Sequence, residues 1–419
     1  MLACAAHYDA QGFGMVWRIL FCTSLLLSAS ALANSETEPR YIIDVLTIEP
    51  GDDALSSWGH TAVRVQDRQD GSDWIYDYGR FLISDDFLRS FITKGATYST
   101  GRRTWKKALN RYAVDRHRQI LAQRIELPRE QAAALVSMLT RDIEPAHSDY
   151  LYDSLVNNCT TKVRDRLDEV TGGCLADFAK GRPTGETYRT VSNRHIRDRP
   201  LVWLLINTFY DPFGDTDLDA WALVFEPDGL LALLDDVRRG ASTCGSALVV
   251  GPIVELAPSA RTSALERRRH GIQQWAMWVT GLLLLTWICF VAPALWPHQP
   301  FLSGTASVGL WLWCGVAGLL GVAIVILLPH PTPSFGGGNL NLTAMHPGLL
   351  ILPLLVRTRA QFRAVSAGIF AIPPLIGVAV SPWVQDAHPF VQIALIVHIS
   401  LWIRIRRQSR EVDNPTGHG

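Results

Sequence analysis

Residues 57–78 read SWGHTAVRVQDRQDGSDWIYDY, and this stretch decides the fold of the N-terminal half of the chain. Two short runs rich in β-branched and aromatic residues, 60–65 and 74–78, flank the turn-rich segment 66–72. This pattern predicts a β-hairpin. The hairpin would begin its first strand at His60 and would place Asp77 on the neighbouring strand.

The sequence around this hairpin indicates a mixed domain from Arg40 to about Arg261. A further strand is predicted at 41–48, where β-branched residues are frequent, and another at 119–127. The expected fold class is α+β.

Two helices are predicted in the same domain. Pro128 opens the first, whose apolar face would hold Ala132, Leu135, Val136 and Leu139. The second is predicted over 162–170, directly after Cys159, and would end at Gly172-Gly173.

The distribution of charge divides the chain of 419 residues. Thirty-nine basic and 39 acidic side chains balance, so no net field indicates nucleic acid or another polyanion as a partner. Nearly all charge precedes Arg269, and the remainder is mostly apolar, with Gly, Pro and Trp. This asymmetry is typical of a soluble domain followed by membrane helices.

The first 33 residues have the features of a signal peptide. Arg18 precedes the apolar run 19–27, and Ala31-Leu32-Ala33 supplies the small residues that signal peptidases accept. Met15 lies just before Arg18, which would make residues 1–14 an over-extended gene start. A retained anchor helix is the alternative. In either case the domain 34–265 is expected to face outward.

A membrane domain is expected over 270–407, followed by a cytoplasmic tail, 408–419. A helix needs about 20 apolar residues to span a bilayer. About five spans are expected, and one of them is long enough only if it begins at Leu342. The five runs are 275–295, 307–328, 349–356, 364–383 with a break at Pro373-Pro374, and 390–403.

The arginines indicate a multi-pass inner-membrane topology with the C-terminus inside. Arg357, Arg359 and Arg363 fall in one predicted cytoplasmic segment, and 404–407 falls in another, as the positive-inside rule requires. The uncharged loop 329–347 falls outside. The three arginines 267–269 do not follow this rule, because they would lie on the outer side of the membrane before the first span. There they would serve as interfacial anchors or contact anionic headgroups.

Three of the seven cysteines, Cys159, Cys174 and Cys244, belong to the predicted periplasmic domain. An odd number in an oxidising compartment leaves at least one thiol unpaired. Cys174 can pair with Cys244 but need not, and the odd thiol points to Cys159.

Cys159 lies in Asn157-Asn158-Cys159-Thr160-Thr161, at a predicted helix start. The helix dipole and the free backbone N–H groups there stabilise a thiolate and lower its pKa. The same N–H groups, with Asn158, could hold a developing oxyanion. The alternative is a small buried structural cysteine.

His60 is the candidate base, because a cysteine nucleophile needs one within hydrogen-bond reach. Asp77, on the neighbouring predicted strand, could orient the imidazole as the third member of a triad. The alternatives are a structural histidine and an acid that caps a turn.

These phrases resemble known enzymes. His60 followed about a hundred residues later by Cys159 at a helix start resembles the circularly permuted branch of the papain-like superfamily, with its lecithin:retinol-acyltransferase-like and NlpC/P60 members. The phrases that are similar to the periplasmic domain of the Lnb lipoprotein N-acyltransferase family are Ser57-Trp-Gly-His60, Tyr76-Asp-Tyr-Gly-Arg-Phe81 and Asn158-Cys-Thr-Thr161. The resemblance continues through 150–153, Trp221, 225–227, His330 and Asn339-Leu-Asn341. Asp77 departs from the Asn expected in many relatives.

The resemblance implies an acyltransferase without metal or cofactor. The Cys159 thiolate would attack an acyl ester of a phospholipid, with His60 as base, and the resulting thioester would acylate the α-amine of a diacylglyceryl-cysteine at a lipoprotein N-terminus. The partners would be the phospholipid donor, the diacylglyceryl lipoprotein acceptor and the membrane, with no nucleic acid. Substrate contacts are expected from Trp58, Tyr78, Asn158, Thr160, His330, Asn339 and Asn341.

Two other functions fit parts of the sequence. A membrane-anchored cysteine peptidase or amidase of the NlpC/P60 superfamily would act on cell-wall peptides, but a wall hydrolase is expected to carry a glycan-binding repeat and a single anchor. A non-catalytic lipid-binding scaffold is the third possibility, and the motif context of Cys159 and His60 argues against it.

Overall fold

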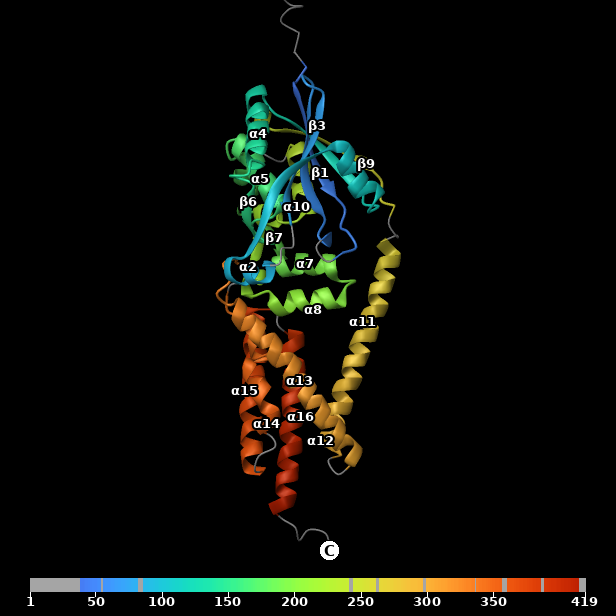
Figure 1. Ribbon diagram of the computed structural model, residues 1–419, viewed down its shortest axis with the longest axis vertical. Helices are drawn as coiled ribbons and strands as arrows, with labels where there is room; N and C mark the ends of the chain where they lie inside the picture. The colour runs from blue at the N-terminus through green and yellow to red at the C-terminus, as the bar shows by residue number, and fades with distance from the viewer. Residues whose placement is uncertain are drawn as a thin grey trace, which may run out of the picture. The chain divides into compact units, whose positions relative to one another are not determined.

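The computed structural model describes residues 38–53, 56–81, 86–240, 244–260, 264–296, 299–335, 337–355, 360–385 and 388–413. The predicted signal peptide, with the alternative start at residues 1–14, lies outside these ranges. The described chain has an N-terminal part built on an antiparallel sheet and a helical C-terminal part (Figure 1). This division follows the change in charge and hydropathy near Arg269.

Seven antiparallel strands form the main sheet, in the spatial order β6-β4-β3-β2-β1-β5-β9. The predicted hairpin is confirmed as β2 (His60–Asp67) and β3 (Ser72–Arg80), with Ala62 opposite Asp77. The other two predicted strands are confirmed as β1 (Tyr41–Ile48) and β5 (Ile120–Glu126). The remaining strands of this sheet are β4 (Ala96–Thr104), β6 (Asp149–Tyr152) and β9 (Val249–Ala257).

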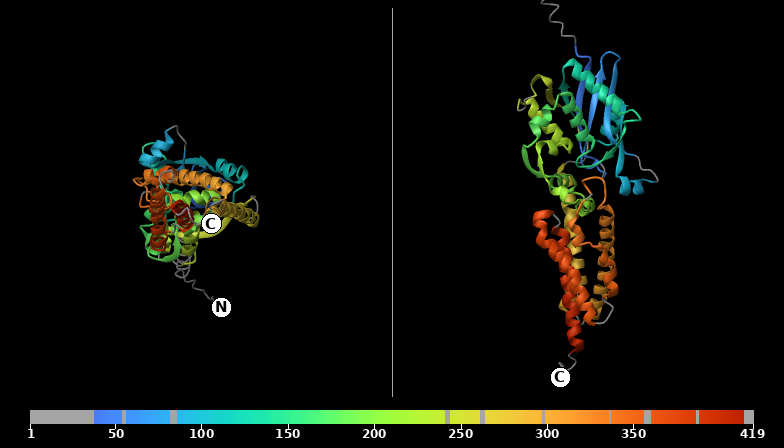
Figure 2. Two further views of the ribbon diagram at one scale, coloured as in Figure 1. Left: turned by 90° about the horizontal axis from the view of Figure 1, so that it is seen from below. Right: turned by 90° about the vertical axis from the view of Figure 1, so that its left-hand side faces the viewer.

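Helices cover both faces of this sheet. On one face lie α4 (Arg129–Asp142), α5 (Cys159–Val170) and α10 (Pro227–Arg238), and α4 crosses in front of the strands in Figure 2. On the other lie α3 (Trp105–Leu109) and the π-turn η2 (Asn110–Val114). Side chains alternate between the two faces along each strand. Along β1, Val45 therefore packs toward α4, whereas Leu46 packs toward α3.

Both predicted helices of this domain are confirmed. In α4, Ala132, Leu135 and Leu139 are buried, as the apolar spacing predicts. Helix α5 begins at Cys159 itself, and it ends at Val170 before Gly172, whose φ of 72° favours glycine.

The other elements of this part are shorter. Helices α7 (Tyr188–Ile196) and α8 (Pro200–Phe209) lie side by side (Figure 1). Strands β7 (Pro183–Thr187) and β8 (Asp217–Asp219) form a separate two-stranded sheet. The remaining elements are α2 (Phe87–Lys94), α6 (Cys174–Ala179), α9 (Ala220–Leu223) and the 3-10 turns η3 (Pro212–Asp215) and η4 (Gly245–Ala247).

Two helical segments of the described chain are long and apolar enough to cross a membrane, His270–Leu295 and Gly304–Leu327. They coincide with the first two predicted spans. The first comprises α11 (Ala264–Thr286), the π-turn η5 (Trp287–Val291) and α12 (Ala292–Leu295), and the second belongs to α13 (Pro300–Leu327). The count of five stays a prediction.

The remaining predicted spans are also helical. The run that needed residues from Leu342 onward consists of short turns and helices, η6 (Leu340–Thr343), η7 (Pro347–Ile351) and α14 (Leu352–Leu355). The last two runs lie in α15 (Ala360–Val384) and α16 (His388–Asp413).

Two boundaries need correction. Helix α15 continues through Pro373-Pro374, where a break was expected; a proline removes one donor from a helix, and a helix within a membrane tolerates this where neighbours satisfy the freed carbonyl. Helix α16 runs to Asp413, so the predicted tail from residue 408 begins inside a helix.

Cys174 and Cys244 form a disulfide, which resolves the pairing that the sequence left open. It joins the start of α6 to the segment before η4 across 70 residues of chain. Cys159 is then the free cysteine of the described residues before α11. The odd thiol is therefore the one at the helix start.

We expect the Cys174→Ala/Cys244→Ala variant to unfold at a lower temperature. Opening a loop of 70 residues costs about 4 kcal/mol in the chain-entropy account. Thermal unfolding of the full chain in detergent should show the same fall for reduced wild type, and a reductant should not change the variant further. Cys159→Ala, which keeps the disulfide, is the control, and an unchanged melting temperature in the double variant would contradict the expectation.

Candidate active site

The Asn158 side chain places Cys159 at the first position of α5. Asn158 Oδ1 accepts the N–H groups of Thr160 (2.9 Å) and Thr161 (3.1 Å), and the Thr161 hydroxyl accepts the Asn158 N–H (2.8 Å). This is a capping box, in which cap and third helical residue satisfy each other's donors. The N–H of Cys159, the first helical residue, has no acceptor within the helix and points out of its N-terminus.

The amide group of Asn158 also fixes the surrounding loops. Its Nδ2 donates to the carbonyls of Ser154 (2.7 Å) and Phe225 (2.8 Å). Both the oxygen and the nitrogen of this side-chain amide are thus engaged in hydrogen bonds with the main chain. Asn158 thus holds the start of α5 in position, and its role at an oxyanion stays a prediction.

His60 is the first residue of β2 and follows Gly59, whose φ of 84° favours glycine. A Cβ on Gly59 would also meet the Ile48 carbonyl oxygen at 2.9 Å. The glycine therefore lets the chain turn closely past β1 before His60 enters the sheet.

The structure brings His60 and Cys159 together. Burial raises the pKa of the Cys159 thiol, but the charge of His60 and a hydrogen bond with its side chain act against burial, as do hydrogen bonds from the Thr61 backbone and the Thr160 hydroxyl. The net effect lowers the pKa of Cys159 below its ordinary value. The thiolate is thus favoured by a pairing that helix position alone would not supply.

A small cavity of about 60 Å³ lies directly against the thiol. Of the predicted substrate-binding residues, Trp58, Asn158 and Thr160 line it together with Cys159. Thr160 is buried, and its hydroxyl lies 3.0 Å from that of Thr61 on β2. The other lining residues are Gly59, Tyr152, Ser154, Ser192, Tyr210, Phe225 and Pro227.

Asp77 is buried on β3, and two arginines take up its carboxylate. Arg80 donates to Oδ1 (2.5 Å), and Arg103 pairs with Oδ2 (2.8 Å). His60 Nε2 is buried and has no hydrogen-bond partner among the described residues, and the ring that lies beside the imidazole is Tyr112, 5.9 Å away between centroids. The role of Asp77 as the group that orients His60 stays a prediction, and the observed carboxylate contacts go to Arg80 and Arg103.

Tyr78 lies in the core beneath α5 and is not among the residues that line the cavity. Its hydroxyl donates to Asp142 (2.5 Å), and Arg166 clamps the same carboxylate. Burial, followed by the Asp142 carboxylate, raises the pKa of Tyr78. These contacts give it a role in holding α5 on the sheet and α4.

Tyr152 provides the aromatic wall of the cavity. Its ring stacks on Tyr98 at 3.9 Å between centroids, and Tyr98 stacks on Phe81 at 4.9 Å. Burial, followed by the charge of Cys159, raises the pKa of Tyr152 well above its ordinary value, so its phenol stays neutral beside Cys159.

The predicted outer loop, 329–347, carries three of the predicted substrate residues, and all three are buried. His330 Nε2 hydrogen-bonds to the Phe91 carbonyl (2.8 Å). Asn339 and Asn341 donate to main-chain carbonyls at the end of α8, those of Asn207, Thr208 and Phe209. These contacts join loop 329–347 to α2 and α8 of the N-terminal part. A role in substrate binding stays a prediction.

Asp153 connects the same loop to the turn before Cys159. Its Oδ1 accepts the N–H groups of Leu155 (2.7 Å) and Val156 (3.2 Å), in the turn that leads to Asn158. Ser334 of the outer loop donates to Asp153 through its hydroxyl (2.5 Å) and its N–H (3.1 Å). Asp153 is 4% exposed, so the loop after α13 braces the turn before Cys159 from the inside.

Several lining residues escaped the sequence reasoning. Tyr152 and Phe225 belong to the phrases that carried the family resemblance, although no role was assigned to them. Ser192 and Tyr210 carry no local motif, because they reach the thiol only through the packing of α7 and α8.

Iodoacetamide should alkylate Cys159 of the wild type at a lower pH than an ordinary thiol, because its pKa is lowered. In His60→Ala only the hydrogen bonds from Thr61 and Thr160 would remain to stabilise the thiolate against burial, so the pKa of Cys159 should rise. Alkylation at neutral pH should then slow by about tenfold for each unit by which the pKa rises. Mass spectrometry of the modified peptide against pH measures this, with Cys159→Ser as the blank. Identical profiles for wild type and His60→Ala would contradict the pairing.

Asp153 and Ser334 should be energetically coupled. We expect Asp153→Ala to destabilise the full chain by about 1–3 kcal/mol, because it leaves buried N–H groups without an acceptor. Ser334→Ala should cost less in the Asp153→Ala background than in wild type, by at least about 0.5 kcal/mol in a double-mutant cycle of unfolding. Ser90→Ala, on α2, is the control, and strictly additive effects at 153 and 334 would exclude the brace.

Comparison with known proteins supports the N-terminal assignment. Residues 31–194 match the family model of the Lnb N-terminal periplasmic domain, a range that contains His60, Asp77 and Cys159. No curated protein and no solved structure matches the chain significantly. The match confirms the resemblance seen in the sequence phrases for this part of the chain.

Proposed function

We propose that the chain is a cysteine-dependent acyltransferase that moves an acyl chain from a membrane phospholipid to the N-terminal amine of diacylglyceryl lipoproteins. The observation that carries the proposal is the free thiol of Cys159, at a capped helix start and with a pKa lowered by the charge of His60, inside a region that matches the Lnb periplasmic domain. Metal and cofactor have no part in this proposal.

The first half-reaction forms a thioester. The Cys159 thiolate attacks the ester carbonyl carbon of the phospholipid, and the negative charge that develops on the carbonyl oxygen meets the Cys159 N–H at the start of α5. The tetrahedral intermediate then expels the lysophospholipid alkoxide, which takes a proton from His60. The acyl group remains on sulfur.

The second half-reaction forms the amide. The α-amine of the diacylglyceryl-cysteine attacks the thioester carbonyl, His60 accepts the amine proton, and the Cys159 thiolate leaves. A thioester intermediate divides one difficult transfer into two easier steps. The neutral phenol of Tyr152 and the ring of Trp58 supply the apolar walls of the cavity around the reacting group.

The fold and topology belong to the same proposal. The sheet domain would be a circularly permuted papain-like domain, with its histidine on a strand that precedes the cysteine helix in the chain. We propose residues 1–33 as signal peptide, 34–265 as periplasmic domain, 270–407 as a membrane bundle of about five helices and 408–419 as a cytoplasmic tail. Both lipid substrates lie in the outer leaflet of the inner membrane, which explains why the domain carries membrane helices.

A cysteine peptidase or amidase acting on cell-wall peptides would use the same thiol and base. The bracing of the thiol loop by Ser334, from a loop that follows an apolar helix, favours a substrate at the membrane. A non-catalytic scaffold would have no need of the lowered pKa of Cys159.

The test is mass spectrometry of lipoprotein N-termini from a strain that lacks its own N-acyltransferase. Wild type should add one acyl chain to the terminal amine, whereas Cys159→Ala and His60→Ala should add none. Cys174→Ala/Cys244→Ala at permissive temperature is a control for folding. Unmodified lipoproteins with wild type, or full activity in Cys159→Ala, would refute the proposal, and cleavage of purified muropeptides would favour the peptidase.

A further inference from the structure

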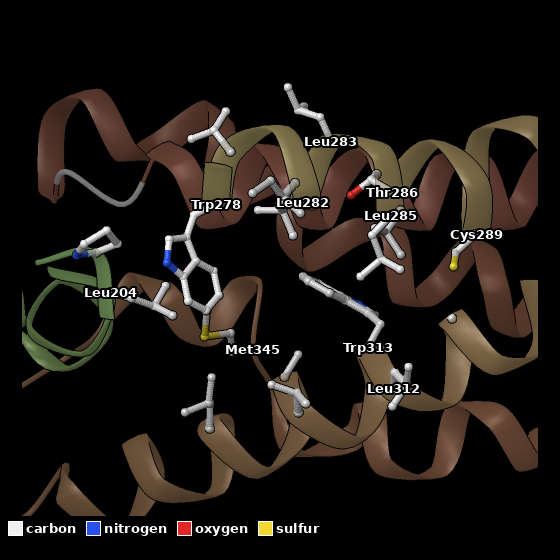
Figure 3. Close-up of a pocket in the computed structure, with 18 of the residues that line it drawn as sticks. Leu204, Trp278, Leu282, Leu283, Leu285, Thr286, Cys289, Leu312, Trp313 and Met345 are labelled. Carbon is white, nitrogen blue, oxygen red and sulfur yellow. The ribbon is translucent and has the colours of Figure 1, made fainter. Parts of the chain in front are cut away.

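A second and much larger cavity, of about 780 Å³, lies among the helices of the C-terminal part and against α8 (Figure 3). Its wall is almost wholly apolar. Figure 3 shows Leu204 from α8 on one side, Leu282 and Leu285 from α11, and Leu312 with Trp313 from α13. Cys159 and His60 do not line it.

The cavity is long. It is lined along α11 and η5 from Trp275 to Phe290, a distance of roughly 22 Å at the rise of a helix. Its volume falls in the range of about 300–1,000 Å³ that is usual for ligand sites. An extended apolar shape of this kind fits an alkyl chain better than a compact ring system.

The walls also indicate where the ligand comes from. The two helical segments that are long and apolar enough to cross a membrane, His270–Leu295 and Gly304–Leu327, both line the cavity. A space between such helices faces acyl chains as its surrounding medium. The occupant we infer is therefore a lipid of the membrane itself.

One end of the cavity is polar and aromatic. Arg197 lines this end and is exposed, and no carboxylate among the described residues forms an ion pair with its guanidinium. Trp275 donates to the Arg197 carbonyl (2.5 Å) and packs edge-to-face on Trp203 at 5.1 Å between centroids. Tryptophans mark the membrane–water interface, and arginine binds phosphate in bidentate geometry.

We propose that this cavity holds one acyl chain of a glycerophospholipid whose phosphate pairs with Arg197. Helix α8 lines the cavity with Leu201 and Leu204, and the residue that follows it, Tyr210, lines the cavity of the thiol. The ten residues of α8 span about 15 Å. The length of this one helix therefore separates the proposed lipid site from the cavity that contains Cys159. The link to turnover rests on the proposed acyl transfer, whereas the binding does not.

The experiment uses the full chain with Cys159→Ala, in detergent, so that no lipid is consumed. The probe is phosphatidylglycerol with a diazirine in the middle of one acyl chain, and photolysis followed by peptide mass spectrometry maps its position. Cross-links are expected on α8 and on the lining residues of α11 and α13. Excess unlabelled phosphatidylglycerol should compete for all of them.

Filling the cavity should abolish this labelling. Val316 lines it and is 60% exposed, and Leu319 on the same helix is 63% exposed but lies outside the lining. Val316→Trp should lower cross-linking to α8 by about tenfold, the factor for 1.4 kcal/mol, and Leu319→Trp should not. Leu312→Trp, a second filling variant, should repeat the loss. Equal labelling in both filling variants and in Leu319→Trp overturns the site.

The phosphate is tested separately. Arg197→Gln should weaken labelling by the phospholipid by about fivefold but leave labelling by a diacylglycerol with the same diazirine chain unchanged. Arg129→Gln, exposed at the start of α4, is the matched control. If the wild type labels equally with diacylglycerol and phospholipid, the pairing of phosphate with Arg197 is wrong.

The outcome is independent of the acyl-transfer test. A chain that leaves lipoproteins unmodified but cross-links in the cavity keeps this site and loses the proposed function. A chain that acylates lipoproteins but shows no competed cross-link on α8 keeps the function and loses the site.

Discussion

The position of Cys159 depends on the side chain of Asn158. Its carbonyl oxygen caps α5, and its amide nitrogen donates to the carbonyls of Ser154 and Phe225. One buried amide therefore fixes the helix start, the loop before it and the segment before α10. Leaving a buried amide group without a hydrogen-bond partner costs free energy, so the loss of one of these contacts would weaken the others. Removing them would release the thiol, its N–H and one wall of the cavity at once.

The sheet provides the second fixed point. Strand β2 begins at His60 and lies between β1 and β3, so the histidine sits on a central strand. Helix α5 packs on this strand through Val163 and Leu167, while the hydroxyls of Thr61 and Thr160 meet beneath the thiol. Cys159 and His60 thus come from two rigid elements that share one core. Such an arrangement keeps catalytic groups in place better than loops would.

Polar contacts join the helical part to this site. Ser334 binds Asp153, while Asn339 and Asn341 hold the carbonyls at the end of α8. Gln385, after α15, donates to the Tyr210 carbonyl (2.8 Å). Tyr210 lines the small cavity, and α8 before it lines the large one. Helix α8 and the residue that follows it therefore connect the two cavities.

The sequence by itself determined the hairpin, the helix that follows Cys159, the apolar face of α4 and the two long apolar helices, because each depends on local period or turn chemistry. Only the tertiary structure decided the remainder. Asp77 faces Arg80 and Arg103, His330 lies against Phe91, and Ser192 and Tyr210 enter the thiol cavity. The pairing of Cys174 with Cys244 belongs to the same class. These contacts join residues whose approach depends on how the strands align and how the helices pack, and no local pattern encodes that.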